Sequence, residues 1–461
     1  MTSIRALVRR FLPEGAVLLS VLTFGSYGMG LVRDRIFART YGAGAELDAY
    51  NAAFVLPELL FDVFIAAGLA APFVPIFMKL VNEEEGAAET FARTILTLAV
   101  AAMGAAAAIL FVIAPITIDL IAPGFTSAEQ RALYTDLFRV MCITPLIFAT
   151  SIVLGEILVA KRRFLYYGIA PLLYNGGIVL GTLLLHDRIG IFGAAVGAVV
   201  GALLHLGIRL VGILRTDVRL RPQLALRMPA VREFLRLMVP RMAGAPIEPL
   251  TFQFFTRVAS GFVAGSLSAV SFARNFQSVP VSLIGVAFSL AAFPSLSAAA
   301  GQGNRAGFVR ILRTNLLTIA TLTILAAIAL FVLSTLAIEL LLGGGAFDAE
   351  DVERTAGLLS VFALSVPIES LTYPLARAIY ATRNTVLPVS ASLAGLGVTI
   401  LATLIFRPAL GLTAIPLAFA LGSATKLSVL AIALPFRIRQ IPDLAAEELS
   451  ETRRSRPSGR G

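Results

Sequence analysis

Long apolar runs, each about as long as a membrane is thick, follow one another along most of the chain. Leu, Ala, Ile and Val fill them, and about 20 such residues let an α-helix cross the hydrocarbon core. A β-barrel would instead show shorter, alternating segments. The pattern predicts twelve spans, near residues 15–38, 49–80, 90–115, 134–160, 166–185, 189–213, 233–258, 264–296, 307–335, 353–381, 386–406 and 411–434.

A polar segment separates the first six runs from the last six. It is rich in arginine: Arg215, Arg219, Arg221, Arg227 and Arg232. We therefore expect an N-terminal six-helix lobe over 1–213, a basic cytoplasmic linker over 214–232 and a C-terminal six-helix lobe over 233–434. Residues 435–461 lose the apolar pattern and predict a disordered, basic cytoplasmic tail.

The two sets of runs repeat each other. Phe73-Val-Pro, a polar turn and Phe91-Ala-Arg93 recur as Phe293-Pro-Ser, a polar turn and Phe308-Val-Arg310. A second echo sets Pro145 and Ala160-Lys-Arg162 beside Pro367 and Ala381-Thr-Arg383. Chance similarity between apolar sequences is the alternative, and recurrence at two places makes it the weaker one. The repeat predicts two parallel lobes around a central cavity.

Composition supports a membrane protein. Of the 461 residues, 57% are hydrophobic and 14% are charged, whereas soluble domains carry about 25% charged residues. The net charge of +10 suggests cytoplasmic loops and anionic headgroups rather than nucleic acid. Basic residues gather in alternate loops, so we expect both termini on the cytoplasmic side of the membrane.

No enzyme chemistry is visible. Cys142 is the single cysteine, so there is no disulfide framework. His186 and His205 are far apart and lack ligand-spaced companions, which suggests no metal site. Gly42-Ala-Gly44 lacks the third glycine and the preceding strand of a nucleotide-binding motif. We therefore expect neither catalytic activity nor a cofactor, although a coupling cation stays open.

Ionisable residues inside the apolar runs are the candidate site. A charge at the bilayer centre costs at least about 2.5–3.5 kcal/mol, so it usually faces a bundle interior or a water-filled cavity. Arg33 ends one apolar run, while Glu58 and Asp62 share a face of the next. In the second lobe, Arg241 and Arg274 also fall within apolar runs. Guanidinium forks match phosphate geometry, and the alternative is structural salt bridges.

Three blocks of the sequence resemble the MurJ/MviN family of the multidrug/oligosaccharidyl-lipid/polysaccharide exporter superfamily. The first block contains Gly30-Leu-Val-Arg33-Asp34, Tyr41-Gly-Ala-Gly44, Asp48-Ala-Tyr50, Leu56-Pro-Glu-Leu-Leu60 and Phe73-Val-Pro-Ile76. The others are Gly285-Val-Ala-Phe288 through Phe293-Pro-Ser-Leu296, and Ala381-Thr-Arg-Asn-Thr-Val-Leu-Pro388. The resemblance spans nearly all the runs. It implies two six-helix lobes around a basic central cavity, in a monomer of the bacterial inner membrane.

The resemblance also implies a substrate and its binding residues. Family members flip lipid II, the undecaprenyl-pyrophosphate-linked peptidoglycan precursor, by alternating access. Arg33 and Asp48 match family positions, and Asn275 stands where the family has an arginine, with Arg274 one residue earlier. Tyr27 and Phe61 replace cavity arginines, and Ala66 replaces a glutamate. Substrate-binding residues are therefore expected at these positions: Arg33, Asp48, Glu58, Asp62, Arg241, Arg274 and Asn275.

Three functions follow as hypotheses. The leading one is a flippase for a polyprenyl-pyrophosphate-linked saccharide, most simply lipid II, moving it from the inner to the outer leaflet. The second is a cation-coupled small-molecule exporter with its ion site at Glu58 and Asp62. The third is a membrane partner of cell-envelope enzymes that transports nothing. The expected partners are the lipid-linked substrate and membrane lipids.

Overall fold

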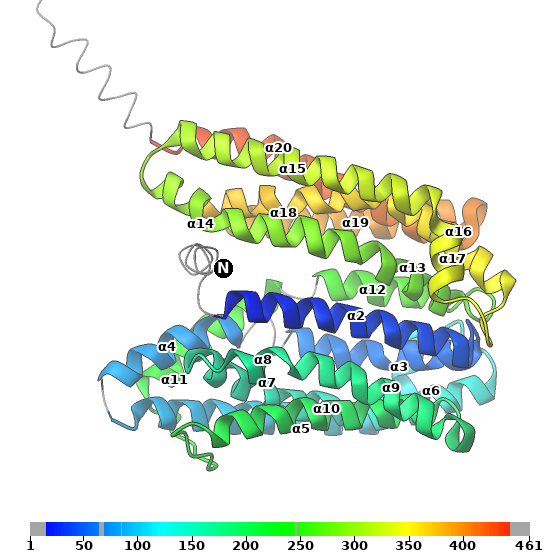
Figure 1. Ribbon diagram of the computed structural model, residues 1–461, viewed down its shortest axis with the longest axis horizontal. Coiled ribbons are helices and arrows are strands. Elements are labelled where there is room, and N and C mark those ends of the chain that lie inside the picture. The colour runs from blue at the N-terminus through cyan, green and yellow to red at the C-terminus, as the bar shows by residue number, and fades with distance from the viewer. Residues whose placement is uncertain (1–14, 64–68, 84, 245–246, 443–461) are drawn as a thin grey trace, which may run out of the picture. The chain divides into compact units, whose positions relative to one another are not determined.

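The computed structural model describes residues 15–63, 69–83, 85–244 and 247–442, and almost all regular structure in these ranges is helical (Figure 1). In this part of the chain the β pairing amounts to an isolated bridge between Gly344 and Phe347. The all-α prediction is therefore confirmed. Residues 443–461, on which most of the predicted tail falls, lie outside the described residues.

Contacts divide the chain into two compact units. Unit 1 comprises Met1–Ser268 and Leu341–Asp351, and unit 2 comprises Ala269–Leu340 and Val352–Gly461. The helices of unit 1 are α2 (Ala16–Tyr41), α3 (Ala45–Phe61), α4 (Ala70–Glu83), α5 (Ala87–Ile121), α6 (Ala128–Met141), α7 (Thr144–Ala160), α8 (Phe164–Gly168), α9 (Ala170–Ile189), α10 (Phe192–Leu214), α11 (Pro229–Gly244) and α12 (Ile247–Ala259).

Helix α13 (Ser266–Pro280) begins in unit 1 and continues in unit 2. A π-helical segment, η2 (Val281–Val286), joins it to α14 (Ala287–Gly301). The remaining elements are α15 (Arg305–Val332), α16 (Ser334–Leu341), α17 (Ala349–Ala363), α18 (Ser365–Ala381), α19 (Val386–Leu410), η3 (Gly411–Thr413) and α20 (Ala414–Arg439). Helix α20 runs past residue 434, and α11 begins inside the predicted linker.

The segment Leu341–Asp351 is held by the end of α2 within unit 1. Arg39 Nε and Nη2 donate to the carbonyl of Gly343 at 3.1 and 2.9 Å, and Ala346 N donates to the carbonyl of Arg39. Gly345 has φ +67°, and a Cβ there would lie 2.3 Å from the Arg39 carbonyl oxygen. Only glycine fits this close approach.

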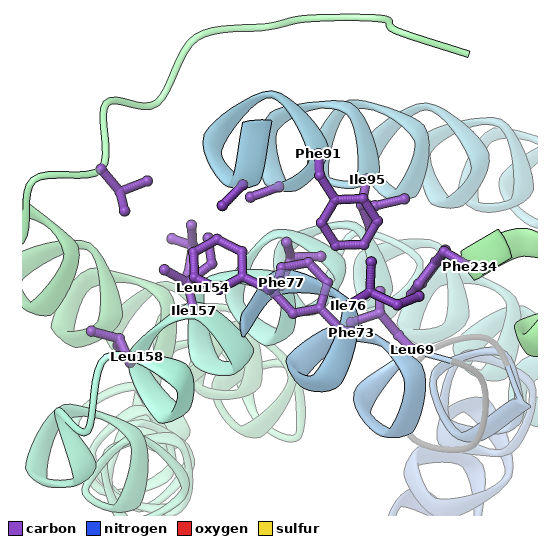
Figure 2. Packing of buried hydrophobic residues seen from close by; sticks show 14 of the residues in the cluster. Leu69, Phe73, Ile76, Phe77, Phe91, Ile95, Leu154, Ile157, Leu158 and Phe234 are labelled. Atoms are coloured by element: carbon purple, nitrogen blue, oxygen red, sulfur yellow. The ribbon is translucent and has the colours of Figure 1, made fainter. Parts of the chain in front are cut away.

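Aromatic packing organises the core of unit 1 (Figure 2). Phe73 of α4, Phe91 of α5 and Phe234 of α11 are almost fully buried. The ring centroids of Phe73 and Phe91 lie 5.3 Å apart, and those of Phe91 and Phe234 lie 5.8 Å apart. Burying each such side chain contributes roughly 1.5–3 kcal/mol relative to leaving it exposed. In unit 2, Phe308 of α15 is equally buried, against α14, α18 and α20.

The internal repeat predicted from the sequence recurs in the backbone. Helices α7 and α18 each have 17 residues, and they end at Ala160 and Ala381. Two residues later, Arg162 (φ 56°) and Arg383 (φ 60°) are the non-glycine residues with positive φ in the described chain. Positive φ is uncommon for arginine, so its recurrence at matched positions shows that the two units share a local design.

The predicted count of twelve spans is not confirmed. Within the described residues, seven helical stretches are long and apolar enough to cross a membrane, or eight if the pair α17 and α18, bent by 42°, forms one span. One of these stretches, Val386–Arg439, holds two helices, α19 and α20, joined by η3. Helix α2 carries Arg33, Asp34 and Arg35 in its second half. The predicted spans 49–80 and 233–258 include residues 64–68 and 245–246, which lie outside the described residues.

Candidate functional site

Arg33 projects from α2 and is held by two polar side chains. Its Nε and Nη2 donate to Asp34 Oδ1 at 3.1 and 2.8 Å, and its Nη1 donates to Asn175 Oδ1 of α9 at 3.1 Å. The side chain of Arg33 is 27% exposed and that of Asp34 is 6% exposed. The guanidinium is thus fixed in orientation, while part of the Arg33 side chain stays accessible.

Further polar groups of unit 1 surround this guanidinium. Glu58 of α3 lies within electrostatic range of both Arg33 and Asp62. Tyr50 and Tyr174 lie within electrostatic range of Arg33 as well. Tyr50 is buried against Phe37, with ring centroids 5.2 Å apart. The structure therefore brings Arg33 and Glu58 into one neighbourhood, with Asp62 one turn farther along α3, and their contact with substrate stays a prediction.

Glu58 and Asp62 differ in their surroundings although they lie one turn apart. Glu58 is exposed, and Asp62 is half-buried at the end of α3, within electrostatic range of Glu248. Pro57 lies inside α3 and cannot donate a backbone hydrogen bond. The two carboxylates can therefore offer charge to water, to a cation or to a bound group.

Asp48 lies at the other end of α3 and contacts the start of α13. Its Oδ2 accepts from Gly265 N, and its Oδ1 accepts from Ser268 N and Ser268 Oγ, all at 2.7 Å. The side chain is 2% exposed. A carboxylate that accepts backbone N–H groups at a helix N-terminus is well stabilised. The structure thus gives Asp48 a capping role about 15 Å along the helix from Glu58, and its contact with substrate stays a prediction.

Arg274 is engaged inside unit 2. Its Nη2 lies 3.1 Å from Glu369 Oε1 and its Nη1 lies 3.4 Å from Glu369 Oε2. Gln277 links to both residues: it accepts from Arg274 and donates to Glu369 Oε2 at 2.9 Å and to Ser365 Oγ at 3.0 Å. The guanidinium also lies over the Phe419 ring, 4.7 Å from its centroid. Arg274 and Glu369 are each 8% exposed, so the structural salt bridge, the alternative considered for Arg274, is present.

The two remaining predicted residues are less defined. Asn275, next to Arg274 on α13, is half-buried. The backbone of Arg241 belongs to α11, but its side chain lies outside the described residues. Substrate contact by either residue stays a prediction.

The structure adds several residues to these groups that the sequence did not indicate. Asn175 and Tyr174 lie in an otherwise apolar helix, and their polar side chains were the feature of the sequence that could have identified them. Gln277 lies one turn after Arg274 on the same helix face, which is a spacing at which side chains meet. Ser365 and Phe419 gave no signal, because their contact with the Arg274 group depends on three helices folding together.

Comparison with known proteins gives a consistent family match. A family model described as "Lipid II flippase MurJ" matches residues 37–446. A relative from Thermotoga maritima, named "Probable lipid II flippase MurJ", is 30% identical over 402 residues, which cover 87% of this chain and 80% of the relative. "Lipid II flippase MurJ" of Burkholderia cenocepacia is 26% identical over 418 residues, which cover 89% of this chain and 80% of the relative.

Solved structures agree on the fold. A lipid II flippase MurJ in an inward closed conformation superposes with a TM-score of 0.80 at 23% identity, covering 93% of this chain and 90% of the other. An inward-facing multidrug transporter of the MATE family gives a TM-score of 0.71 at 14% identity, covering 90% of this chain and 94% of the other. At these identities the likeness establishes a shared transporter fold.

Proposed function

This chain belongs to the MurJ family of lipid II flippases, and we propose that it moves lipid II across the membrane in which its apolar helices lie. The observation that carries the proposal is the neighbourhood of Arg33. Asp34 and Asn175 orient its guanidinium, and 27% of the Arg33 side chain is exposed. A planar fork held in this way suits a pyrophosphate, because two parallel N–H···O bonds add geometric specificity to charge attraction.

The local charge implies a condition for binding. Arg33 supplies one positive charge, whereas Asp34 and Glu58 supply two negative charges in the same neighbourhood. A pyrophosphate adds further negative charge, so its binding is favoured when a cation or a proton neutralises Glu58 or Asp62. We infer that these two carboxylates shape the field at the site and make binding reversible, with a coupling cation as the simplest neutralising partner.

The proposed topology rests on the distribution of arginine in loops, and the proposed direction of transport rests on the family resemblance. Both termini lie in the cytoplasm of a bacterial cell whose inner membrane holds the protein, and lipid II moves from the inner to the outer leaflet by alternating access. Two six-helix lobes around a central cavity, with Asp48, Arg241, Arg274 and Asn275 near the substrate, complete this proposal. The multidrug-exporter hypothesis is not favoured, because its MATE likeness extends to fold alone.

The test is rescue of a bacterial strain depleted of its own lipid II flippase. Wild-type protein is expected to restore growth. Arg33→Ala is expected to abolish rescue while membrane levels stay normal, and Arg33→Lys is expected to rescue poorly because a point charge cannot replace a fork. Arg188→Ala, at an exposed position near the end of α9, is the matched control and should rescue fully.

Three outcomes separate the hypotheses. Failure of the wild-type protein to rescue, despite normal membrane levels, would contradict lipid II as the substrate. Rescue by Arg33→Ala would remove Arg33 from the binding site. Loss of the Arg33→Ala protein from the membrane, with Arg33→Lys at normal levels and fully active, would assign Arg33 to structure.

A further inference from the structure

Helix α15 carries an open, basic groove at its N-terminal end. The groove measures about 670 Å³ and is lined by Arg305, Val309, Arg310, Arg313, Thr314 and Leu317. Arg305 is already engaged. It donates to the carbonyl of Arg439, the last residue of α20, and to the carbonyl of Ile441, which follows α20. Arg310 and Arg313 are exposed, and within the described part of the chain neither has a hydrogen-bond or ion-pair partner.

The repeat supplies an internal comparison for this groove. Phe91-Ala-Arg93 of α5 corresponds to Phe308-Val-Arg310 of α15, and Phe91 and Phe308 are both fully buried. In unit 1, Arg93 Nη2 pairs with Glu89, one turn earlier, and Arg93 Nε donates to the carbonyl of Arg219 at 2.6 Å. The residue equivalent to Glu89 in unit 2 is Ala306, so Arg310 lacks the carboxylate that neutralises Arg93.

The chain also covers the equivalent surface in unit 1. Gln223 N donates to Thr97 Oγ1 and Ala225 N donates to Thr94 Oγ1, both at 3.1 Å, so the segment after α10 lies along the first turns of α5. Thr314 is the counterpart of Thr97, and it lines the open groove. The groove on α15 therefore corresponds to the covered surface at the start of α5. In the described part of unit 2, neither a carboxylate nor a covering segment occupies it.

The surface that continues from the groove indicates the occupant. Helix α15 is one of the stretches apolar enough to cross a membrane. Leu317, Ile324, Ile328 and Phe331 recur on one face of α15 and are 58%, 47%, 55% and 53% exposed. This spacing forms a continuous apolar stripe that leads from the arginines into the hydrocarbon. A ligand with an anionic head and long acyl chains matches both parts.

We propose that the groove of Arg310, Arg313 and Thr314 binds an anionic phospholipid of the surrounding leaflet. The phosphate lies between the two guanidinium groups and accepts from Thr314 Oγ1, while an acyl chain follows the apolar stripe of α15. Each arginine near a membrane surface contributes about a five-fold preference for anionic lipid. The two arginines together give a preference for anionic lipid of about 25-fold at most. The site does not depend on which lipid-linked substrate the protein moves.

A tryptophan reporter tests the proposal, because the sequence contains no tryptophan. Leu317→Trp places the single fluorophore about 10 Å along α15 from Arg310. The full chain is reconstituted in phosphatidylcholine mixed with phosphatidylglycerol, with bromine on the acyl chains of one lipid at a time. Preferential quenching by brominated phosphatidylglycerol, by about five-fold or more in relative association constant, is expected. Soluble phosphate carries no bromine and cannot produce this signal.

Two controls define the site. Arg310→Gln with Arg313→Gln, in the Leu317→Trp background, should reduce the preference to near one. Leu325→Trp, on the same helix and 60% exposed, lies about 12 Å farther along and should show equal quenching by both lipids. Equal quenching at Leu317→Trp in the otherwise wild-type chain would overturn the proposal, and so would a preference that survives loss of both arginines.

The segment after α20 is the competing occupant, because Asp443, Glu447, Glu448 and Glu451 carry negative charge. Changing these four residues to Asn or Gln in the full chain separates the cases. An unchanged lipid preference supports the proposal. A preference that appears only in this variant would show that the chain's own C-terminal segment fills the groove, and the lipid site would be wrong.

Discussion

Removing one partner of the Arg274–Glu369 pair is expected to destabilise the protein strongly, whereas replacing both partners by apolar residues is not. Each residue is 8% exposed, and their closest atoms are 3.1 Å apart. A single change leaves the other charge buried without its partner, which costs about 3–5 kcal/mol. Replacing the pair by apolar residues of similar volume is often neutral or stabilising.

The perturbations are Arg274→Met, Glu369→Leu and the double variant. Gln277 loses its Glu369 partner in two of them but keeps Ser365, at a cost of about 1 kcal/mol. For a unit of the size of unit 2, each kcal/mol shifts the thermal midpoint by about 2–4 °C. Each single change should therefore lower the midpoint of this unit by about 6–20 °C. The double variant should stay within a few degrees of wild type. Retention of a monodisperse size-exclusion peak after heating measures the midpoint.

Arg377→Ala is the matched control. Arg377 belongs to α18, like Glu369, but it is half-buried and stacks over Phe293, 5.9 Å from the ring centroid. Such a contact contributes about 0.5–1 kcal/mol, so this change should shift the midpoint by a few degrees at most. Single variants at Arg274 and Glu369 that shift no more than this control would refute the reasoning from the buried pair.

The double variant also tests whether Arg274 contacts substrate. If it is as stable as wild type and rescues the flippase-depleted strain, Arg274 acts through structure alone. If it is stable and fails to rescue, one of its two residues serves transport as well. The second result would support the expectation, drawn from the family resemblance, that the second lobe shares the charge of the pyrophosphate.

Two further predictions concern Asp48 and the orientation in the membrane. Asp48→Ala should lower the free energy of unfolding by about 1–3 kcal/mol, because buried N–H groups at the start of α13 lose their acceptor. Asp48→Asn keeps one acceptor oxygen and should cost less. Equal thermal midpoints for both variants and wild type would contradict the capping role. The orientation is tested with single cysteines in a background with Cys142→Ser. An impermeant maleimide should label Ser127→Cys and Ala346→Cys in intact cells, and it should label Leu224→Cys only after permeabilisation. The reverse pattern would invert the proposed orientation.

Local patterns in the sequence were sufficient for the fold. Apolar runs of membrane length require helices, because every backbone polar group in lipid must be satisfied within the segment. The repeat was also visible, and the matched helix ends at Arg162 and Arg383 confirm it. The number of spans was harder to predict, because hydropathy does not locate breaks such as the 42° bend between α17 and α18, which lies inside a single predicted span.

Side-chain partners across the fold could not be predicted in the same way. Glu369 lies 95 positions from Arg274, and Gly265 lies 217 positions from Asp48. Helical spacing shows which residues share a face, but it does not show which helix lies opposite. The sequence therefore identified Arg274 and Asp48 as charges that need an explanation, while the Glu369 pair and the capping contact required the folded structure.

Partners separate the charges that serve structure from those with another use. Arg274 has Glu369, Arg93 has Glu89, and Arg209 donates to the carbonyl of Ser151 while it stacks over Tyr167. Partners of this kind are local, and they leave little charge to offer a ligand. Arg33 also pairs with Asp34, but 27% of its side chain stays exposed, and Arg310 and Arg313 face outward beside an apolar stripe. We propose that a phosphate of the leaflet completes the balance of charge at Arg310 and Arg313, and that a substrate phosphate binds Arg33 once a cation or a proton neutralises Glu58 or Asp62.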